Sequence, residues 1–181
     1  MKANATTASP ALTQEELTGW FAGRLPENLF DGPPAITTDR DEILVVGEIS
    51  EPEVPADAGE AGRAAARSAR IARFRSETRD RRIGVAREAE RLFGRKVSWG
   101  ARCGGFEEHF TTLGVPVMTR LRMEDRRVLD TLIDAGVARS RSEALAWAVR
   151  LVAQHQSDWI ESLRQALTNV EKVRAEGPDR S

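Results

Sequence analysis

Two groups of arginine, serine and methionine side chains in the last third of the chain have the types and spacing to bind an anionic polymer. The first group directly precedes a helical pattern and consists of Arg139, Ser140, Arg141 and Ser142. A helix N-terminus offers free backbone N–H groups, so this group predicts a phosphate site. The second group alternates along an extended stretch and consists of Met118, Arg120 and Arg122. Alternation places them on the face opposite Leu121, which predicts that they point outward.

Residue types that carry catalysis are few in this sequence. Cys103 is the only cysteine, and His109 and His155 are the only histidines, far apart along the chain. This spacing provides no zinc site, and no glycine-rich phosphate loop or nucleophile motif occurs. Cys103 suits either a packed core position or a reactive thiol, whose pKa the neighbouring Arg102 would lower if the thiol were exposed. We therefore expect no catalytic residue, no metal, no cofactor and no enzymatic activity.

The net charge of −1 hides an asymmetry between the two ends of the chain. Residues 1–60 contain 12 acidic and 3 basic side chains, whereas residues 61–181 contain 16 acidic and 24 basic ones. The basic part predicts an anionic partner, although both parts could equally be solvated or face each other. Arginine supplies nearly all of the positive charge. Its planar group suits phosphate and guanine, and a coding bias toward arginine is the alternative explanation.

The sequence carries no pattern typical of membrane insertion or export. No run of about 18 apolar residues occurs. The first residues, MKANATTASPALTQEEL, lack the apolar centre of a signal peptide. A single cysteine fits a reducing compartment. We therefore expect a cytoplasmic protein without membrane contact.

The first two thirds of the chain predict a small mixed α+β domain of unknown family at residues 12–114, after a disordered tail at 1–11. Thr13 and Glu16 form a capping box that begins a short helix. Residues 35–38 and 42–49 predict a hairpin whose second strand is central and buried. Residues 51–62 are acidic and predict a loop or linker. Residues 63–93 predict one long helix, with a bend or break at Gly84 and a C-cap at Gly94. Residues 96–102 and 108–113 predict a second hairpin.

The long helix is rich in arginine. Residues 63–82 contain eight arginines and two acids, and Arg63, Arg67 and Arg70 share one face. This face is a candidate for contacts with phosphate groups, such as those of DNA. Pairing with the acidic residues 39–60, or simple solvation, explains the same pattern.

The C-terminal third predicts a strand at residues 117–123, a helix that ends near Gly136, and a second helix after Ser140. Ser140 and Glu143 again form the S-x-x-E capping pattern. Residues 155–174 predict an amphipathic helix. Trp147 and Leu151 lie four residues apart and predict an exposed apolar spot.

Residues 115–154 resemble the ribbon-helix-helix (CopG/Arc/MetJ-like) family of DNA-binding proteins. The resemblance rests on MTRLRM, EDRRVLDTLIDAG and ARSRSEALAWAVRLV. It implies that two chains pair their strands into a β-ribbon that enters the major groove of double-stranded DNA. It also implies base reading by Met118, Arg120 and Arg122, and phosphate binding by the group at residues 139–142. The chain departs from the family where Arg122-Met123 replaces the usual proline or serine before the first helix.

The expected fold class is therefore α+β, with a C-terminal ribbon-helix-helix (β-α-α) after a mixed domain that has two hairpins and a long basic helix. The expected function is a homodimeric DNA-binding transcriptional regulator, such as a repressor, that can form higher oligomers on DNA. An antitoxin or adaptor that binds a protein partner through residues 155–174 or the N-terminal domain is the alternative. A third hypothesis makes residues 12–114 a ligand sensor.

Overall fold

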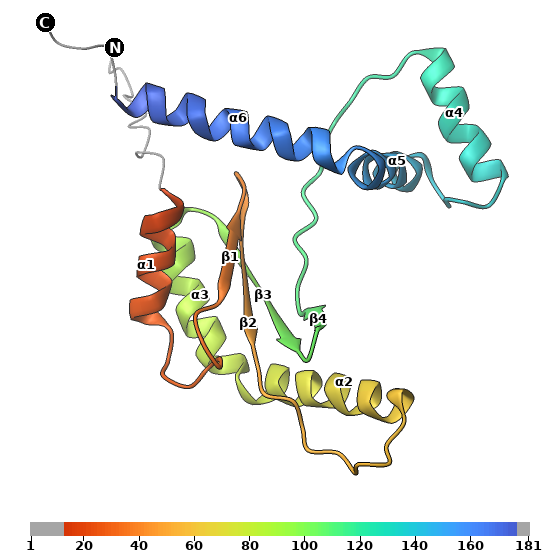
Figure 1. The fold of residues 1–181 in the computed structure, drawn as a ribbon. Coiled ribbons are helices and arrows are strands. Elements are labelled where there is room, and N and C mark those ends of the chain that lie inside the picture. Colours follow the sequence, from red (N-terminus) through yellow and green to blue (C-terminus); the bar gives the residue numbers. More distant parts are fainter. Residues whose placement is uncertain (1–12, 177–181) are drawn as a thin grey trace, which may run out of the picture. The chain divides into compact units, whose positions relative to one another are not determined.

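The computed structural model describes residues 13–176 and contains two compact units (Figure 1). The first unit ends at Pro116 and the second begins at Val117. The disordered tail expected at residues 1–11 lies outside the described residues. Each unit is described below by itself.

The first unit is built on a four-stranded sheet in the order β1-β2-β3-β4. The strands are β1 (Ala35–Thr38), β2 (Glu42–Glu48), β3 (Lys96–Cys103) and β4 (Phe106–His109). The two hairpins expected from the sequence form, since β1 pairs with β2 and β3 pairs with β4 in antiparallel fashion. The second turn is tighter than expected and contains Gly104 and Gly105, both with positive φ. A parallel pairing of β2 with β3 joins the hairpins into one sheet.

Three helices belong to this unit: α1 (Gln14–Arg24), α2 (Glu60–Glu77) and α3 (Arg79–Phe93). The capping box at Thr13 is confirmed, because its side chain accepts a hydrogen bond from the Glu16 N–H and the Glu16 carboxylate accepts from the Thr13 N–H. Gly94 ends α3 with φ 66°, as expected of a C-cap glycine.

The single long basic helix expected over residues 63–93 is wrong, because the chain breaks at Thr78 between α2 and α3. Thr78 is buried, and its hydroxyl donates to the Phe74 carbonyl at 2.6 Å. The same hydroxyl accepts from Arg82 Nε at 3.0 Å. These bonds hold the junction in place, while Gly84, where we expected the bend or break, lies within α3.

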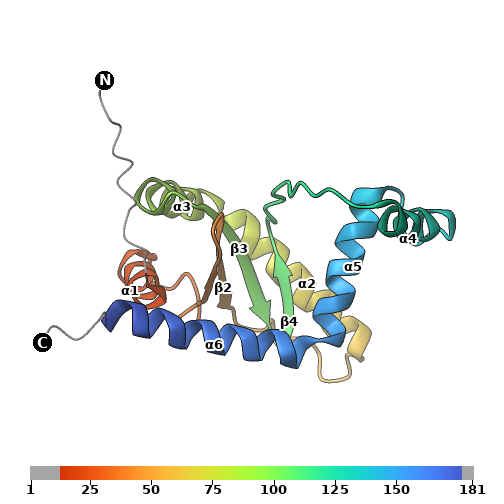
Figure 2. The same cartoon turned by 90° about the horizontal axis from the view of Figure 1, so that it is seen from above.

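The core of the first unit lies between these helices and the sheet (Figure 2). Alternate side chains of β2 and β3 enter it, as the two-residue period of a strand requires. Helices α1, α2 and α3 each contribute two buried apolar residues. The buried cluster is Leu17, Phe21, Leu29, Ile43, Val45, Ile49, Ile71, Phe74, Val85, Ala89, Trp99, Ala101, Cys103 and Phe110. The expectation that residues 42–49 form a central buried strand is therefore confirmed.

The second unit is helical and consists of α4 (Met123–Asp134), α5 (Arg141–His155) and α6 (Ser157–Glu176). The expected C-terminal ribbon-helix-helix is wrong, because residues 117–122 form no strand. Alternating residue types favour an extended backbone, and a strand also needs a neighbouring edge for its hydrogen bonds. Within residues 13–176, the last sheet strand ends at His109 and offers this segment no partner.

The described part of the chain forms six helices. None of its helices combines the length and the apolar character that crossing a bilayer requires.

Candidate nucleic-acid interface

The turn between α4 and α5 fixes the N-terminus of α5. Gly136 adopts φ 75°, a left-handed conformation that glycine adopts readily, and the next N–H, of Val137, donates to the Leu132 carbonyl at 2.9 Å. Ser140 is the N-cap, and its hydroxyl accepts from the Glu143 N–H at 3.2 Å. The Glu143 carboxylate in turn accepts from the Arg139 N–H at 2.9 Å. The cap predicted at Ser140 is therefore confirmed, with Arg139 as the residue that Glu143 reaches.

The predicted phosphate-binding group lies around this cap. The N–H groups of Arg141 and Ser142 are in the first turn, where an α-helix supplies no internal acceptor. Arg141 donates from Nε and Nη2 to the two carboxylate oxygens of Asp130, at 2.7 and 2.8 Å. This bidentate hydrogen bonding lowers the pKa of Asp130 and raises the pKa of Arg141. Arg141 is therefore already engaged by a carboxylate, whereas Arg139 is exposed and forms no ion pair with a described residue.

The segment 117–122, here called the arm, runs into α4 without forming a helix or strand, and its last residue, Arg122, has an extended backbone. Met118 is 94% exposed, and Arg120 and Arg122 are exposed too. Leu121 is the arm residue that packs against the small core of this unit, as expected for its inward face. Arg126 Nη1 donates to the Leu121 carbonyl at 2.6 Å and tethers the arm to α4.

A groove of about 320 Å³ brings the arm and the α5 N-terminus together. Met118 and Thr119 line one part of it, and Arg141 and Ser142 line another. Residues that the sequence separates by more than twenty positions thus share one surface. Arg120, Arg122, Arg139 and Ser140 are exposed residues of the same unit that do not line the groove.

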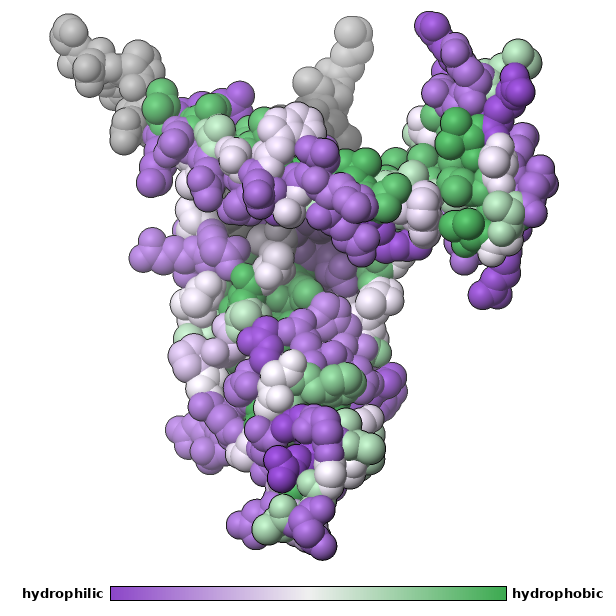
Figure 3. Space-filling view, turned by 45° about the vertical axis from the view of Figure 1, so that its right-hand side comes forward, coloured by the Kyte–Doolittle hydropathy of each residue, from purple (hydrophilic) through white to green (hydrophobic). Residues whose placement is uncertain are grey.

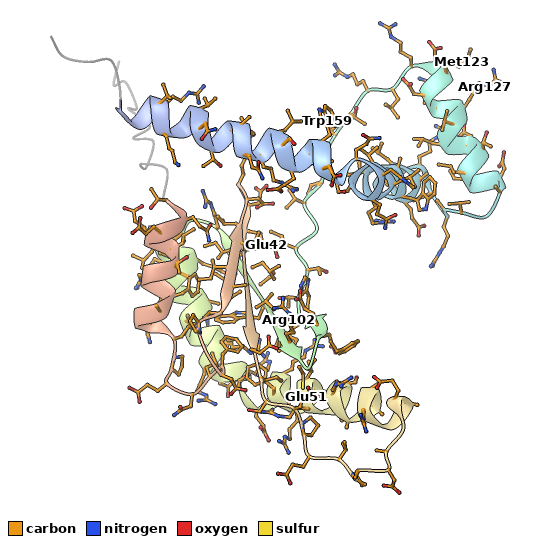
Figure 4. The ribbon with its side chains drawn as sticks, viewed as in Figure 1. Glu42, Glu51, Arg102, Met123, Arg127 and Trp159 are labelled. Carbon is orange, nitrogen blue, oxygen red and sulfur yellow. The ribbon has the colours of Figure 1, made fainter. Side chains whose placement is uncertain are left out.

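The candidate contacts on the arginine-rich helix belong to the first unit. Arg67 is bound by two acids, Glu51 at 2.9 Å and Glu60 at 3.1 Å, and Glu51 lies beside α2 in Figure 4. Arg63 donates from Nε to the Ala58 carbonyl at 3.1 Å. Arg70 is half-buried. The acidic-pairing alternative therefore holds for Arg67, which leaves Arg63 and Arg70 as the members of this face without a carboxylate partner among the described residues.

The second unit has a very small core. Its buried cluster is Leu129, Ala138 and Ala144, supported by the partly buried Leu121, Leu132 and Leu145. Many apolar side chains remain on its surface, some of which are drawn in green in Figure 3. They include Val128, Val137, Val149, Val152, Trp159, Leu163, Leu167, Val170 and Val173. The expected exposed spot at Trp147 and Leu151 is wrong, because both side chains are half-buried and Val149 and Val152 are exposed instead.

Cys103 and His109 are further residues with chemically reactive side chains, and each contacts a neighbouring group. Cys103 is fully buried, with its thiol 3.8 Å from the Ser50 carbonyl, and this burial raises the thiol pKa. This agrees with a packed core cysteine rather than a nucleophile. His109 contacts the Glu107 carboxylate at 2.8 Å. Within the part of the chain that the structure describes, no three His, Cys, Asp or Glu side chains are grouped to hold a metal ion.

Two features of the charged side chains do not follow from the sequence pattern. Asp130 forms an ion pair with Arg141, which lies eleven residues further along the chain, and nothing in the local sequence pattern indicates this pairing. Arg82 is buried at the junction of α2 and α3, although it stands in the sequence as one of eight similar arginines. The separation of four residues between Thr78 and Arg82 was the available signal, because residues i and i+4 are neighbours on a helix.

Comparison with known proteins divides the chain in the same way as its structure. Residues 15–109 match the family described as "Rv1265-like protein, N-terminal domain", and residues 122–174 match the one described as "Mb1296 C-terminal domain". The first match ends with β4, and the second begins at the N-cap of α4. No ribbon-helix-helix family matches.

Similar proteins come from mycobacteria. "Uncharacterized protein Rv1265" of Mycobacterium tuberculosis and "Uncharacterized protein Mb1296" of Mycobacterium bovis are each 54% identical over 160 residues, which cover 88% of this chain and 69% of the relative. No solved structure matches the chain significantly. With one family covering most of the first unit and another most of the second, the chain belongs to the Rv1265-like family.

Proposed function

We propose that this protein is a DNA-binding transcriptional regulator that acts in the cytoplasm and contacts double-stranded DNA through its second unit. The observation that carries the proposal is the groove shared by the arm and the α5 N-terminus. The exposed Met118 lines this groove together with Arg141 and Ser142, the first residues of α5, and the first-turn N–H groups of a helix have no acceptor within the helix. Phosphate contacts of this kind set the register of a protein on DNA, and side chains that reach base edges supply specificity.

The roles divide between the two parts of this surface. Arg139, Ser140 and Ser142, with the first-turn N–H groups, hold phosphates at the α5 N-terminus. The arm presents Arg120 and Arg122 to base edges, where a guanidinium forms a bidentate contact with guanine. Met118 offers an apolar contact to a thymine methyl group. No covalent chemistry is involved, so regulation works by occupancy of an operator.

The working state in this proposal is a homodimer that can assemble further on DNA. Three buried residues are a small core for a unit of three helices, and its exposed valines and leucines would be covered by a second copy. Two copies would also present two arms to a palindromic operator. If light scattering at micromolar protein concentration gives the mass of a single chain, the homodimer is contradicted.

The test of the proposal is binding of the intact chain to DNA fragments from its own promoter region, at several salt concentrations. We expect a fragment to be bound in preference to scrambled duplex of equal length. Affinity should fall with salt, with a slope that gains about 0.9 for each phosphate contact. Absence of binding to any fragment at low salt and micromolar protein would overturn the proposal.

Release of Arg141 gives a further prediction. In an Asp130→Asn chain the carboxylate that engages Arg141 is gone, so the guanidinium becomes available to a phosphate. We expect tighter DNA binding, with a salt slope steeper by about one for each chain, measured by fluorescence anisotropy.

The matched control for this variant is Asp134→Asn. Asp134 lies on the same helix, is exposed and forms no ion pair with a described residue. Both variants remove one negative charge, so a general electrostatic gain would appear in both. An equal effect of the two variants would show that Arg141 makes no phosphate contact.

A second candidate function is an antitoxin or adaptor that uses the same DNA surface for autoregulation. The exposed apolar stripe of α6 favours it, since Trp159, Leu163, Leu167 and Val170 recur at helical spacing (Trp159 is labelled in Figure 4). Such a stripe is what a helix needs to lie in the groove of a partner protein. Co-purification of a second small protein, lost when Leu163 and Leu167 are changed to Ser, would separate this candidate from the first.

A further inference from the structure

The first unit contains a cavity that the proposed DNA surface does not use. It is lined by residues of α2, α3 and β3 where α2 meets α3, and it has a volume of about 620 Å³. Its apolar wall includes Val97, Trp99 and Phe110. Arg75, Arg79 and Arg82 also line it. The site therefore combines aromatic surface with a concentration of positive charge, and its volume suits a small organic molecule.

Arg82 is the central group of this cavity, because it is only 7% exposed and still lines the open space. Its Nε donates to the Thr78 hydroxyl at 3.0 Å, and its Nη2 donates to the Arg75 carbonyl at 2.7 Å. Its guanidinium carbon lies 4.8 Å from the ring centre of Phe110 and 6.0 Å from that of Trp99. A guanidinium has five N–H bonds, so three remain without a protein acceptor among the described residues.

No carboxylate among the described residues balances the charge of Arg82. No described acid forms an ion pair with it, and burial, followed by repulsion from Arg75 and Arg79, lowers its pKa to about 10. The acid that lines the cavity is Glu90, and Lys96 occupies its carboxylate at 2.8 Å. A buried charge without a partner is costly, so an anion in this cavity would be stabilised strongly.

We propose that this cavity binds a small organic carboxylate, whose charged group meets Arg82 and whose apolar body lies against Trp99 and Phe110. Both N–H bonds of Nη1 and one of Nη2 have no acceptor among the described residues, so donors remain for the two oxygens of a carboxylate. An organic acid would also contact the apolar wall of the cavity, which a bare inorganic anion would not. This ligand site is independent of the DNA surface on the second unit.

A purely structural role for Arg82 accounts for less of what is observed. Closing the end of α2 requires the two bonds to Thr78 and Arg75, and these leave the rest of the guanidinium unused. The unused donors and the open volume are explained together by a ligand.

The experiment titrates the full chain with octanoate and with 3-phenylpropionate, using their neutral amides as controls. Binding is measured by calorimetry and by the nitrogen-15 shifts of Arg82 Nε and the Trp99 indole. We expect saturable binding of at least one acid, and an affinity at least about 10-fold weaker for its amide. Arg82→Lys keeps the charge but loses the planar pair of donors, so it should weaken binding by a similar factor.

A second pair of variants keeps the test decisive if Arg82→Lys fails to fold. Ala72 lines the cavity from an exposed position, whereas Ala64 is exposed on the same helix away from it. Ala72→Trp should abolish binding by filling the cavity, and Ala64→Trp should leave it unchanged. Equal binding of acid and amide, tighter binding of inorganic phosphate, no binding of either acid, or full binding by Ala72→Trp would each overturn the proposal. None of these results would bear on DNA binding by the second unit.

Discussion

An Arg120→Ala chain is expected to lose preference for its operator over scrambled DNA by about 5- to 150-fold, while keeping most of its non-specific affinity. The reason is that a bidentate arginine–guanine contact discriminates against other bases by about 1–3 kcal/mol. Arg120 is exposed on the arm next to Leu121, which packs against the core of the second unit. The arm is therefore anchored, and the loss of one long side chain should not displace it.

The measurement is a competition gel shift in which operator and scrambled duplex compete for the variant at two salt concentrations. Arg127→Ala is the matched control, because Arg127 is an exposed arginine of α4 outside the arm (Figure 4). It should reduce both affinities slightly and leave their ratio unchanged. If Arg120→Ala also lowers both affinities equally, Arg120 binds phosphate and the assignment of base reading is wrong. If it lowers neither, the arm is not part of the DNA surface.

Features that depend on a few neighbouring residues were predictable from the sequence. The caps at Thr13 and Ser140 and the glycine ends at Gly94 and Gly136 follow from local hydrogen bonding and backbone freedom, and the structure has them at these residues. The two hairpins of the sheet are local in the same sense, because their strands are separated by short turns.

Features that depend on distant partners were not predictable. The parallel pairing of β2 with β3 joins residues more than fifty positions apart, and no local pattern specifies it. The break at Thr78 depends on a buried hydroxyl, and its sequence context is that of a continuous helix. The arm has the alternation of a strand, but strand formation also needs a partner edge, which the described chain does not supply.

The candidate site shows the same division. Arginines and serines beside a helix start indicate where a phosphate would bind, because the helix N-terminus is a local property. The local sequence does not show which of these arginines has an acidic partner. Arg141 is engaged by Asp130 on the preceding helix, while Arg139, two residues earlier, forms no such pair with a described residue. Sequence patterns therefore indicate the candidate phosphate-binding surface. The packing of α4 against α5 determines which charged side chains remain available on it.

Leu129→Ala is expected to destabilise the second unit by about 2–5 kcal/mol, because a buried leucine is replaced by a side chain that leaves a cavity. Leu129 is the one large side chain among the three buried residues of this unit, so few neighbours can move to fill the space. The first unit has its own core of fourteen buried residues and should keep its stability. Amide hydrogen exchange resolves the two units, with faster exchange expected in α4 and α5 and unchanged exchange in β2 and β3.

The control for this variant is Arg127→Ala, two residues away on the same helix and exposed, which should change stability by no more than about 0.5 kcal/mol. Both proteins must be compared at one concentration, because a dimer gains stability by mass action. In a dimer covered by the exposed valines and leucines, Leu129→Ala should also weaken self-association, since the helices that present those side chains would no longer hold their positions. Unchanged exchange in α4 and α5 would mean that Leu129 is not central to this unit. Faster exchange in β2 and β3 as well would mean that the two units fold as one.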